Sequence, residues 1–341
     1  MGYQTLKYNG KLDLELGGSL SDFQIGYHTW GSLNKQKDNV IWICHALTAN
    51  SDAQDWWPGM IGNGYLFDPS HYFIVCANIP GSCYGTSGPL SENPETGKPY
   101  YRTFPDLTFR DVVNSHEILR KHLGIQKIHT VIGGSIGGQQ AVEYSIMYPD
   151  LIDHLVFIAS SVAYAPWGIA FGESQRLAIE ADQSFYEDIP EGGLRGLRAA
   201  RSIALLSYRN DIIYNKTQSE ESCEVVKNFR ASSYQDYQGD KLVKRFNAYS
   251  YYTLLNLSDT HNVGRNRGSK EGALKKISAK ALSIGISSDL LFPVYEQKFL
   301  AEHVENACFK EIDSLYGHDG FLIETDKLTQ IIQTFYNKDE N

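Results

Sequence analysis

Residues 128–148 read IHTVIGGSIGGQQAVEYSIMY, and this stretch decides the fold. Its first part, Ile128–Gly133, is a short apolar run that predicts a buried strand, and a helical pattern follows at Gly137–Tyr148. The pattern G-x-S-x-G lies between them, with Ser135 at its centre. In this context the pattern is typical of a sharp turn that presents a serine hydroxyl at the N-terminus of a helix. Ser135 is therefore a candidate nucleophile.

A glycine-rich turn with an incidental serine is the alternative interpretation of this motif. A phosphate-binding or dinucleotide-binding loop fits less well, because no G-x-G-x-x-G lies in register and no Gly-Lys-Ser/Thr follows. A nucleophilic serine also needs a base and a carboxylate that orients the base. The rest of the chain can therefore separate these interpretations.

Two downstream segments supply such partners in the order serine, acid, histidine. Asp289 follows the apolar run 281–286, and His318 lies in the glycine-flanked loop Tyr316–Gly320. Taken alone, Asp289 could cap a helix and His318 could be an ordinary loop histidine. Together with Ser135 they predict a Ser-His-Asp triad.

The apolar run Asn39–Leu47 ends where a fold of this kind supplies one donor of an oxyanion hole. We assign that donor to the backbone N–H of Leu47 and the second donor to Ile136, the residue after the nucleophile. Both would stabilise the negative oxygen of a tetrahedral intermediate. His45, in the same loop, is expected to support the loop rather than to ionise in catalysis.

Apolar runs of the same kind recur along the chain and alternate with helical patterns. Near-continuous apolar runs suit a parallel sheet that is covered on both faces, and strand–helix–strand spacing indicates βαβ units. The sequence therefore predicts an α/β fold with a mostly parallel sheet flanked by helices. The expected parallel strands are 39–47, 72–78, 128–133, 154–159 and 281–286, with antiparallel edge strands at 12–16 and 23–30 and a further helix at 110–123.

The strand pattern is interrupted at residues 162–276, where helical and loop-like patterns dominate. We therefore predict a core made of residues 1–161 and 277–341, with a helical lid insertion at 162–276. Tyrosine concentrates in this insertion, since residues 164–252 hold 9 of the 22 tyrosines. Aromatic walls with polar tips suit a substrate pocket. The tail Asn337–Asn341 is expected to fray.

Composition and charge argue against several classes of protein. The 341 residues carry a net charge of −9 without a basic block, which disfavours binding to nucleic acid or to an anionic membrane. Five scattered cysteines without a C-x-x-C pair argue against a disulfide framework or a zinc site and for a reducing compartment, the cytoplasm. Met1–Gly18 has no signal-peptide core.

The uncharged stretch Leu155–Gly172 contains Pro166 and small residues, so it predicts a buried strand running into a loop rather than a membrane span. Polar contexts predict surface positions for His122, His129, His154, His261 and His303.

With these residues in place, the chain resembles the homoserine O-acyltransferase family of the α/β-hydrolase fold, chiefly homoserine O-acetyltransferase. The resemblance runs from about Phe23 to Ile323. A lone G-x-S-x-G occurs in many hydrolases, but the blocks around His45 and in the insertion are far more specific. The matching blocks are His45–Thr48, Gly81–Pro89, Phe104-Pro105, Arg110-Asp111, Gly133–Gly138, Gln175-Arg176, Ala200-Arg201, Ser207–Arg209, Ser233-Tyr234, Tyr237–Gly239, Arg245-Phe246, Ser288-Asp289, Phe292-Pro293 and Tyr316–Asp319.

The resemblance implies a ping-pong acyl transfer. Ser135, deprotonated by His318, would attack the thioester of acetyl-CoA, while Asp289 orients the imidazole. The hydroxyl of L-homoserine would then attack the acetyl-serine, giving O-acetyl-L-homoserine for methionine biosynthesis. Acetyl-CoA is thus a substrate, no metal or prosthetic group is expected, and the family implies a homodimer through the inserted helices.

The same resemblance implies the residues that bind the amino-acid substrate. Arg201 matches an arginine for the substrate carboxylate, and Asp319 matches the residue that holds its ammonium group. Tyr208 lies seven residues after Arg201 and so shares its helix face. Thr48 is expected to line the pocket. Both Arg201 and Arg209 could instead be solvated or paired on an amphipathic helix.

Several positions depart from the family pattern. Asn50, Asn247 and Gly320 stand where an acidic residue, Asp and Ala are usual, and Ile136 replaces Met. These changes leave the triad intact, but they leave the donor open between acetyl-CoA and succinyl-CoA and the acceptor open between homoserine and serine. An esterase or thioesterase on the same triad, in which water takes the acyl group, is a further alternative. The last alternative is a catalytically inactive binding module on the same fold.

Overall fold

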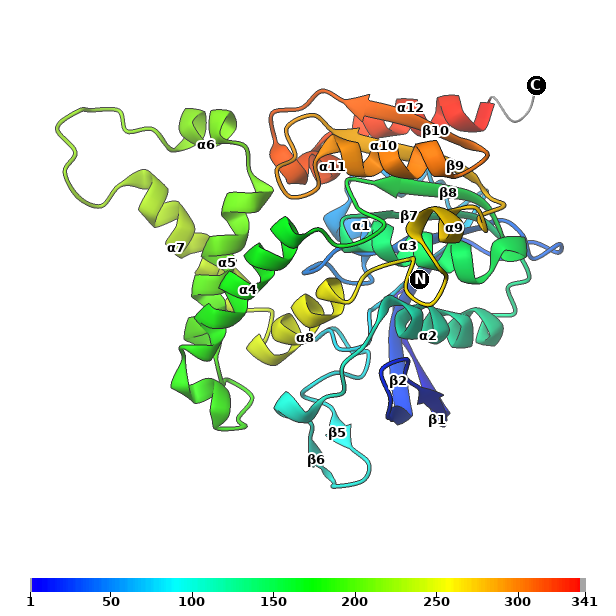
Figure 1. Cartoon of the computed structure of the whole chain (residues 1–341), viewed down its shortest axis with the longest axis horizontal. Helices are drawn as coiled ribbons and strands as arrows, with labels where there is room; N and C mark the ends of the chain where they lie inside the picture. The colour runs from blue at the N-terminus through cyan, green and yellow to red at the C-terminus, as the bar shows by residue number, and fades with distance from the viewer. Residues whose placement is uncertain (1, 338–341) are drawn as a thin grey trace.

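The computed structural model describes residues 2–337, and an eight-stranded sheet forms its centre (Figure 1). The strands of this sheet are β1 (Tyr3–Asp13), β2 (Ser19–Trp30), β3 (Val40–Cys44), β4 (Phe73–Ala77), β7 (Ile128–Gly134), β8 (Ile152–Ile158), β9 (Lys280–Ile286) and β10 (Ala307–Ile312), and a separate hairpin consists of β5 (Glu92–Asn93) and β6 (Lys98–Pro99). The helices are α1 (Ala53–Trp56), α2 (Phe109–His122), α3 (Ile136–Met147), α4 (Pro166–Glu180), α5 (Leu194–Tyr208), α6 (Asp211–Gln218), α7 (Arg230–Val243), α8 (Ala248–Asp259), α9 (Lys270–Leu274), α10 (Val294–His303), α11 (Gly320–Ile323) and α12 (Thr325–Asn337).

The sheet is parallel except at one edge. Its strand order is β1-β2-β4-β3-β7-β8-β9-β10, in which β2 pairs antiparallel with both β1 and β4. All other neighbours pair in parallel. The predicted α/β fold with a mostly parallel sheet flanked by helices is therefore confirmed.

The two outermost strands differ from the sequence-based expectation. β1 was expected at residues 12–16 but lies at Tyr3–Asp13, and β10 was not expected. Both strands are largely half-buried or exposed, because each has a neighbour on one side only. Edge strands of this kind lack the continuous apolar run that identifies a central strand.

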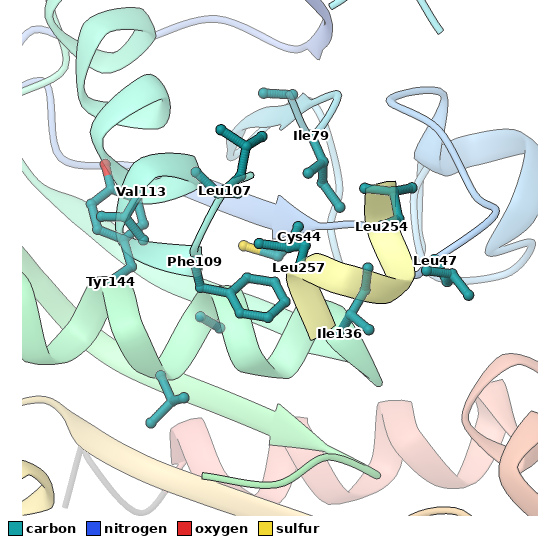
Figure 2. Packing of buried hydrophobic residues seen from close by; sticks show 14 of the residues in the cluster. Cys44, Leu47, Ile79, Leu107, Phe109, Val113, Ile136, Tyr144, Leu254 and Leu257 are labelled. Atoms are coloured by element: carbon teal, nitrogen blue, oxygen red, sulfur yellow. The ribbon is translucent and has the colours of Figure 1, made fainter. Parts of the chain in front are cut away.

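The central strands bury both of their faces. In β3, Val40, Trp42 and Cys44 belong to one hydrophobic cluster, whereas Ile41 and Ile43 belong to a second cluster. This alternation follows from the two-residue period of a strand. Figure 2 shows part of the first cluster, in which side chains of α2, α3 and α8 gather around Cys44. Side chains of α12 contribute to the second cluster on the opposite face.

Helices α4 to α9 lie between β8 and β9 in the chain, in the region predicted to be the lid. In Figure 1, α4 to α8 lie beside the sheet, and α6 and α7 project furthest from it. The uncharged stretch 155–172 contains the end of β8, a loop and the start of α4, so the expected strand and loop are joined by a helix. In the described part of the chain, residues 2–337, no helix has the length and apolarity to cross a membrane. The proposed division into core and lid stays a prediction. Of the expected frayed tail, Asn337 ends α12, and 338–341 lie outside the described residues.

His261 corrects one expectation about the insertion. It was predicted at the surface, but it is buried, and its Nε2 lies 2.9 Å from the carbonyl oxygen of Ser161. Its ring packs edge-on against Phe109 at a centroid distance of 5.2 Å. Burial lowers the pKa of His261 to about 3. The polar sequence context of His261 gave no sign of this packing, because Phe109 is distant in the chain.

Ion pairs tie the segment after α8 to the core. Arg110 of α2 pairs with Glu15 at 2.6 Å and with Glu143 of α3 at 3.0 Å. Arg265 pairs with Glu15 at 2.8 Å, and Arg267 pairs with Glu143 at 2.5 Å. Since Glu143 is almost fully buried, removing either of its arginines would leave a poorly compensated charge. The network thereby fixes α3, the helix that begins just after Ser135.

Candidate active site

Ser135 occupies the turn between β7 and α3 in a strained conformation. Its φ of 58° and ψ of −130° are unusual for a residue with a side chain. A Cβ atom at Gly137 would lie 2.1 Å from the carbonyl oxygen of Cys44, so only glycine allows this approach. The Ser135 N–H donates to the Ile158 carbonyl at 3.1 Å, and the Ser160 hydroxyl donates to the Ser135 carbonyl at 2.6 Å. These contacts hold the predicted nucleophile turn in place.

Asp289 and His318 form the predicted pair. Asp289 Oδ2 lies 2.7 Å from His318 Nδ1, and both residues are buried. Asp289 Oδ1 accepts the backbone N–H groups of Leu291 and Phe292 at 2.8 and 2.9 Å. This arrangement assigns the Nδ1 proton to the bond with Asp289. His318 Nε2 has no hydrogen-bond partner among the described residues, so it is available to a substrate or to Ser135.

The surroundings of His318 set its protonation. Its ring packs among those of Tyr208, Phe292 and Phe321 at centroid distances of 5.8, 5.2 and 5.3 Å. Burial lowers the pKa of His318, but the charge and the hydrogen bond of Asp289, together with the charge of Asp319, outweigh burial and raise the pKa above its usual value of 6.5. A base with a raised pKa accepts a proton more readily from a hydroxyl group.

The two predicted oxyanion donors lie beside Ser135. Leu47, Ile136 and Ser135 line one small cavity. Among the described residues, neither the Leu47 N–H nor the Ile136 N–H donates to a protein acceptor. Free amides next to a nucleophile, one of them at a helix N-terminus, can bind a negatively charged oxygen.

His45 supports the loop that carries Leu47, in agreement with the sequence-based interpretation. Its Nδ1 lies 2.9 Å from the Ala46 carbonyl, and its Nε2 accepts the Ile79 N–H at 3.0 Å. Gln140 of α3 donates to the His45 carbonyl at 3.0 Å. Burial lowers the pKa of His45 to about 4, so the ring is neutral. Its Nδ1 therefore acts as the donor and its Nε2 as the acceptor.

The remaining predicted site residues meet at a second cavity of about 80 Å³ that also reaches Ser135. Asp289 lies behind His318, and Ile136 faces the smaller cavity. The second cavity thus brings together residues from four separate segments of the chain. The predicted residues that line the second cavity are Leu47, Thr48, Ser135, Arg201, Tyr208, His318 and Asp319.

The charged residues of this second cavity differ in their pairing. The Arg201 guanidinium lies 5.5 Å from the centre of the Tyr208 ring, which confirms that the two residues share one face of α5. No hydrogen bond or ion pair joins Arg201 to another described residue. Asp319 pairs with Arg209 at 2.7 Å, and Arg209 also donates to the Tyr234 hydroxyl at 3.2 Å. Burial raises the pKa of Asp319 despite the nearby cations. Of the two arginines, Arg201 is therefore the one available to an anionic ligand.

The departures from the family pattern have local explanations. Asn247 caps α8 by accepting the Ser250 N–H at 2.8 Å, a role that Asp fills equally well. A Cβ atom at Gly320 would lie 2.8 Å from Ile286 Cγ2, so this chain favours glycine there. Asn50 accepts the backbone N–H two residues later at 2.7 Å and thereby shapes its own loop.

Three supporting residues were not identified from the sequence. Gln297 of α10 donates to the Ser160 carbonyl at 2.5 Å, and Ser160 in turn holds Ser135. Arg245 donates to the Thr48 carbonyl and to the Tyr84 hydroxyl, both at 2.5 Å. The position of Ser160 just after a parallel strand was a usable signal, but the partners of Arg245 and Gln297 are too distant in sequence to be inferred. The described residues contain no group of three or more His, Cys, Asp or Glu side chains placed to hold a metal ion.

Comparisons with known proteins agree with this geometry. A family model described as alpha/beta hydrolase fold matches residues 39–325. A homoserine O-acetyltransferase of Cyclobacterium marinum is 47% identical over 325 residues, which cover 95% of this chain and 92% of the relative. The crystal structure of homoserine O-acetyltransferase from Bacillus anthracis superimposes with a TM-score of 0.89 at 25% identity and covers 97% of each chain. Esterase E22 also gives a TM-score of 0.89, at 23% identity over 98% of this chain and 99% of its own, and this likeness shows the fold alone.

Proposed function

Since the chain belongs to the homoserine O-acetyltransferases of the α/β-hydrolase fold, it transfers an acetyl group to L-homoserine, and we propose that Ser135, His318 and Asp289 carry out the transfer. The observation that carries this proposal is the Asp289–His318 pair at 2.7 Å beside a cavity that Ser135 and Arg201 both line. An amino-acid acceptor and an acyl-serine can meet in that cavity. The product, O-acetyl-L-homoserine, serves methionine biosynthesis.

The first half-reaction acylates Ser135. His318 Nε2 takes the hydroxyl proton as the Ser135 oxygen attacks the thioester carbonyl of acetyl-CoA. The amides of Leu47 and Ile136 stabilise the resulting oxyanion. When the intermediate collapses, the carbon–sulfur bond breaks, His318 returns its proton to the thiolate, and CoA leaves. Asp289 stabilises the imidazolium throughout and is not itself protonated.

The second half-reaction transfers the acetyl group to the acceptor. The side-chain hydroxyl of L-homoserine gives its proton to His318 and attacks the acetyl carbonyl, after which Ser135 leaves with that proton. Arg201 binds the substrate carboxylate, since a guanidinium fork matches a carboxylate and this one forms no hydrogen bond or ion pair with a described residue. Asp319 binds the ammonium group, and Tyr208 and Thr48 form the adjoining walls.

Two further proposals concern the cellular location and the oligomeric state of the enzyme. None of the five cysteines, all of which lie in the described part of the chain, forms a disulfide bond, which supports a reducing, cytoplasmic location. We also propose a homodimer formed through the inserted helices. This is supported by the exposed apolar side chains of Leu206, Ile212 and Tyr237 on α5, α6 and α7.

A donor and acceptor matrix tests the proposed function. The purified enzyme is incubated with acetyl-CoA or succinyl-CoA and with L-homoserine or L-serine, and free CoA and the acylated product are measured. We expect acetyl-CoA with homoserine to be the fastest combination. Release of CoA from acetyl-CoA at a rate that homoserine does not change would instead identify a thioesterase.

Replacing the proposed carboxylate ligand should affect the acceptor selectively. For Arg201→Leu we expect the KM for homoserine to rise about 10- to 100-fold, because a charge-assisted hydrogen bond contributes about 1.5–3 kcal/mol. Acetylation of Ser135 by acetyl-CoA, followed by mass spectrometry, should stay near the wild-type rate. Arg198→Leu is the matched control, since Arg198 lies on the same helix but pairs with Asp236 and Asp240. Equal homoserine KM values in the two variants would remove Arg201 from the acceptor site.

A further inference from the structure

We propose that the small cavity beside Leu47 and Ile136 holds the acyl group and restricts it to the size of acetyl, with Leu255 as the residue that sets this limit. The inference rests on the proposed acyl-serine mechanism and adds the basis of donor selection. It follows from the positions and contents of the two cavities that meet at Ser135.

The position of His318 assigns a role to each cavity. His318 must reach both the departing sulfur of CoA and the attacking hydroxyl, so both have to lie in the cavity that His318 lines. The oxyanion points at the amides of Leu47 and Ile136. The remaining substituent of the tetrahedral carbon, the acyl chain, must extend in another direction. The small cavity starts at Ser135 and is not lined by His318, and it offers that direction.

The size of this cavity matches a methyl group. Its volume is about 20 Å³, compared with about 80 Å³ for the cavity beside His318. A cavity that holds one water molecule has a volume of at least about 10–15 Å³. This cavity is little larger, so an acyl chain longer than acetyl would have to displace its walls. The apolar walls are formed by Leu47, Ile136, Phe171, Leu255, Leu291 and Phe292.

Three polar residues of the same cavity already have partners, and Tyr164 and Tyr208 are uncharged. Ser207 and Ser258 donate their hydroxyl protons to helix carbonyls at 2.8 and 2.9 Å. The amide nitrogen of Gln175 donates to the Phe171 carbonyl at 2.9 Å, and its oxygen accepts the Tyr251 hydroxyl at 2.6 Å. No Lys, Arg or His is among the residues that line this cavity, all of which are described. A succinyl carboxylate would therefore be buried without a counter-charge, at a high cost in free energy.

Leu255 is the wall residue best suited to a test. It is buried on α8, and it does not line the cavity that holds His318. Leu254, its neighbour on the same helix, is also buried but lines neither cavity (Figure 2 shows it in the hydrophobic cluster). Leu255→Ala and Leu254→Ala thus remove the same atoms from the same helix, and only the first enlarges the cavity.

The experiment compares kcat/KM for p-nitrophenyl acetate, propionate and butyrate, and then for acetyl-, propionyl-, butyryl- and succinyl-CoA. For the wild type we expect a loss of about 10-fold or more for each added methylene. Leu255→Ala should raise the butyrate-to-acetate ratio at least about 10-fold, and Leu255→Val should favour propionate if the alanine variant folds poorly. Succinyl-CoA should stay a poor donor in every variant.

Several results would overturn the inference. These are a flat acyl-length profile in the wild type, an equal shift of the ratio in Leu254→Ala, or the use of succinyl-CoA by Leu255→Ala as efficiently as butyryl-CoA. The p-nitrophenyl esters need no amino-acid acceptor. A failure to acylate homoserine would therefore count against the proposed function, whereas the ester profile tests the cavity separately.

Discussion

Ser135→Ala is expected to abolish acyl transfer, with kcat reduced by at least about 10⁴-fold. The variant lacks the oxygen that forms the acyl-enzyme, whereas the cavity, the oxyanion donors and the Asp289–His318 pair remain. Mass spectrometry after incubation with acetyl-CoA, in the absence of homoserine, should find an added acetyl group on the wild type and none on the variant. Binding of homoserine, measured by calorimetry, should persist.

Ser145→Ala is the matched control for this prediction. Ser145 lies on α3 like the residues just after Ser135, is also buried, and donates its hydroxyl to the Ala141 carbonyl at 2.9 Å. We expect it to keep nearly full activity. Substantial transfer by Ser135→Ala would support direct transfer from acetyl-CoA to homoserine without an acyl-serine. An acetyl group on a different residue would show that the nucleophile lies elsewhere.

Asp289→Asn is expected to lower kcat by about 10⁴-fold and to change its pH dependence. The amide accepts a hydrogen bond less well and carries no charge, so it neither fixes the productive tautomer of His318 nor stabilises the imidazolium. In the wild type, His318 must be neutral to act as a base. The rate therefore falls as the pH falls through the pKa of His318, which lies above 6.5. Without the Asp289 charge, burial lowers that pKa, so the acidic limb of the profile should move to lower pH.

The measurement is the pH profile of acetyl-CoA consumption for both proteins. Asp153→Asn provides the control, because Asp153 is half-exposed, pairs with Lys127 at 2.9 Å and lies at the start of β8, away from the carboxyl ends of the strands. It should leave the rate and the profile unchanged. An acidic limb that stays in place in Asp289→Asn would mean that the titrating group is not His318.

The sequence determined the parts of this protein that depend on local pattern. The central strands can be identified from the sequence because both of their faces are buried, which gives an uninterrupted apolar run. The turn at Ser135 can also be identified from its G-x-S-x-G pattern. Gly137 in this pattern must be glycine because a side chain there would clash with the carbonyl group of Cys44. Asp289 could be placed because it follows the apolar run 281–286, and His318 could be placed because it lies in a glycine-flanked loop and completes the chain order serine, acid, histidine.

Only the tertiary structure decided how these parts meet. The edge strands β1 and β10, the burial of His261, and the pairing of Arg209 rather than Arg201 with Asp319 all depend on neighbours far away in the chain. The two cavities that meet at Ser135 belong to the same category. Their volumes are set by side chains from α4, α5, α8 and the loops after β3, β7, β9 and β10, and a volume enclosed by several segments is not a property of any one of them. A sequence pattern can name a nucleophile, but the space around it is decided by packing.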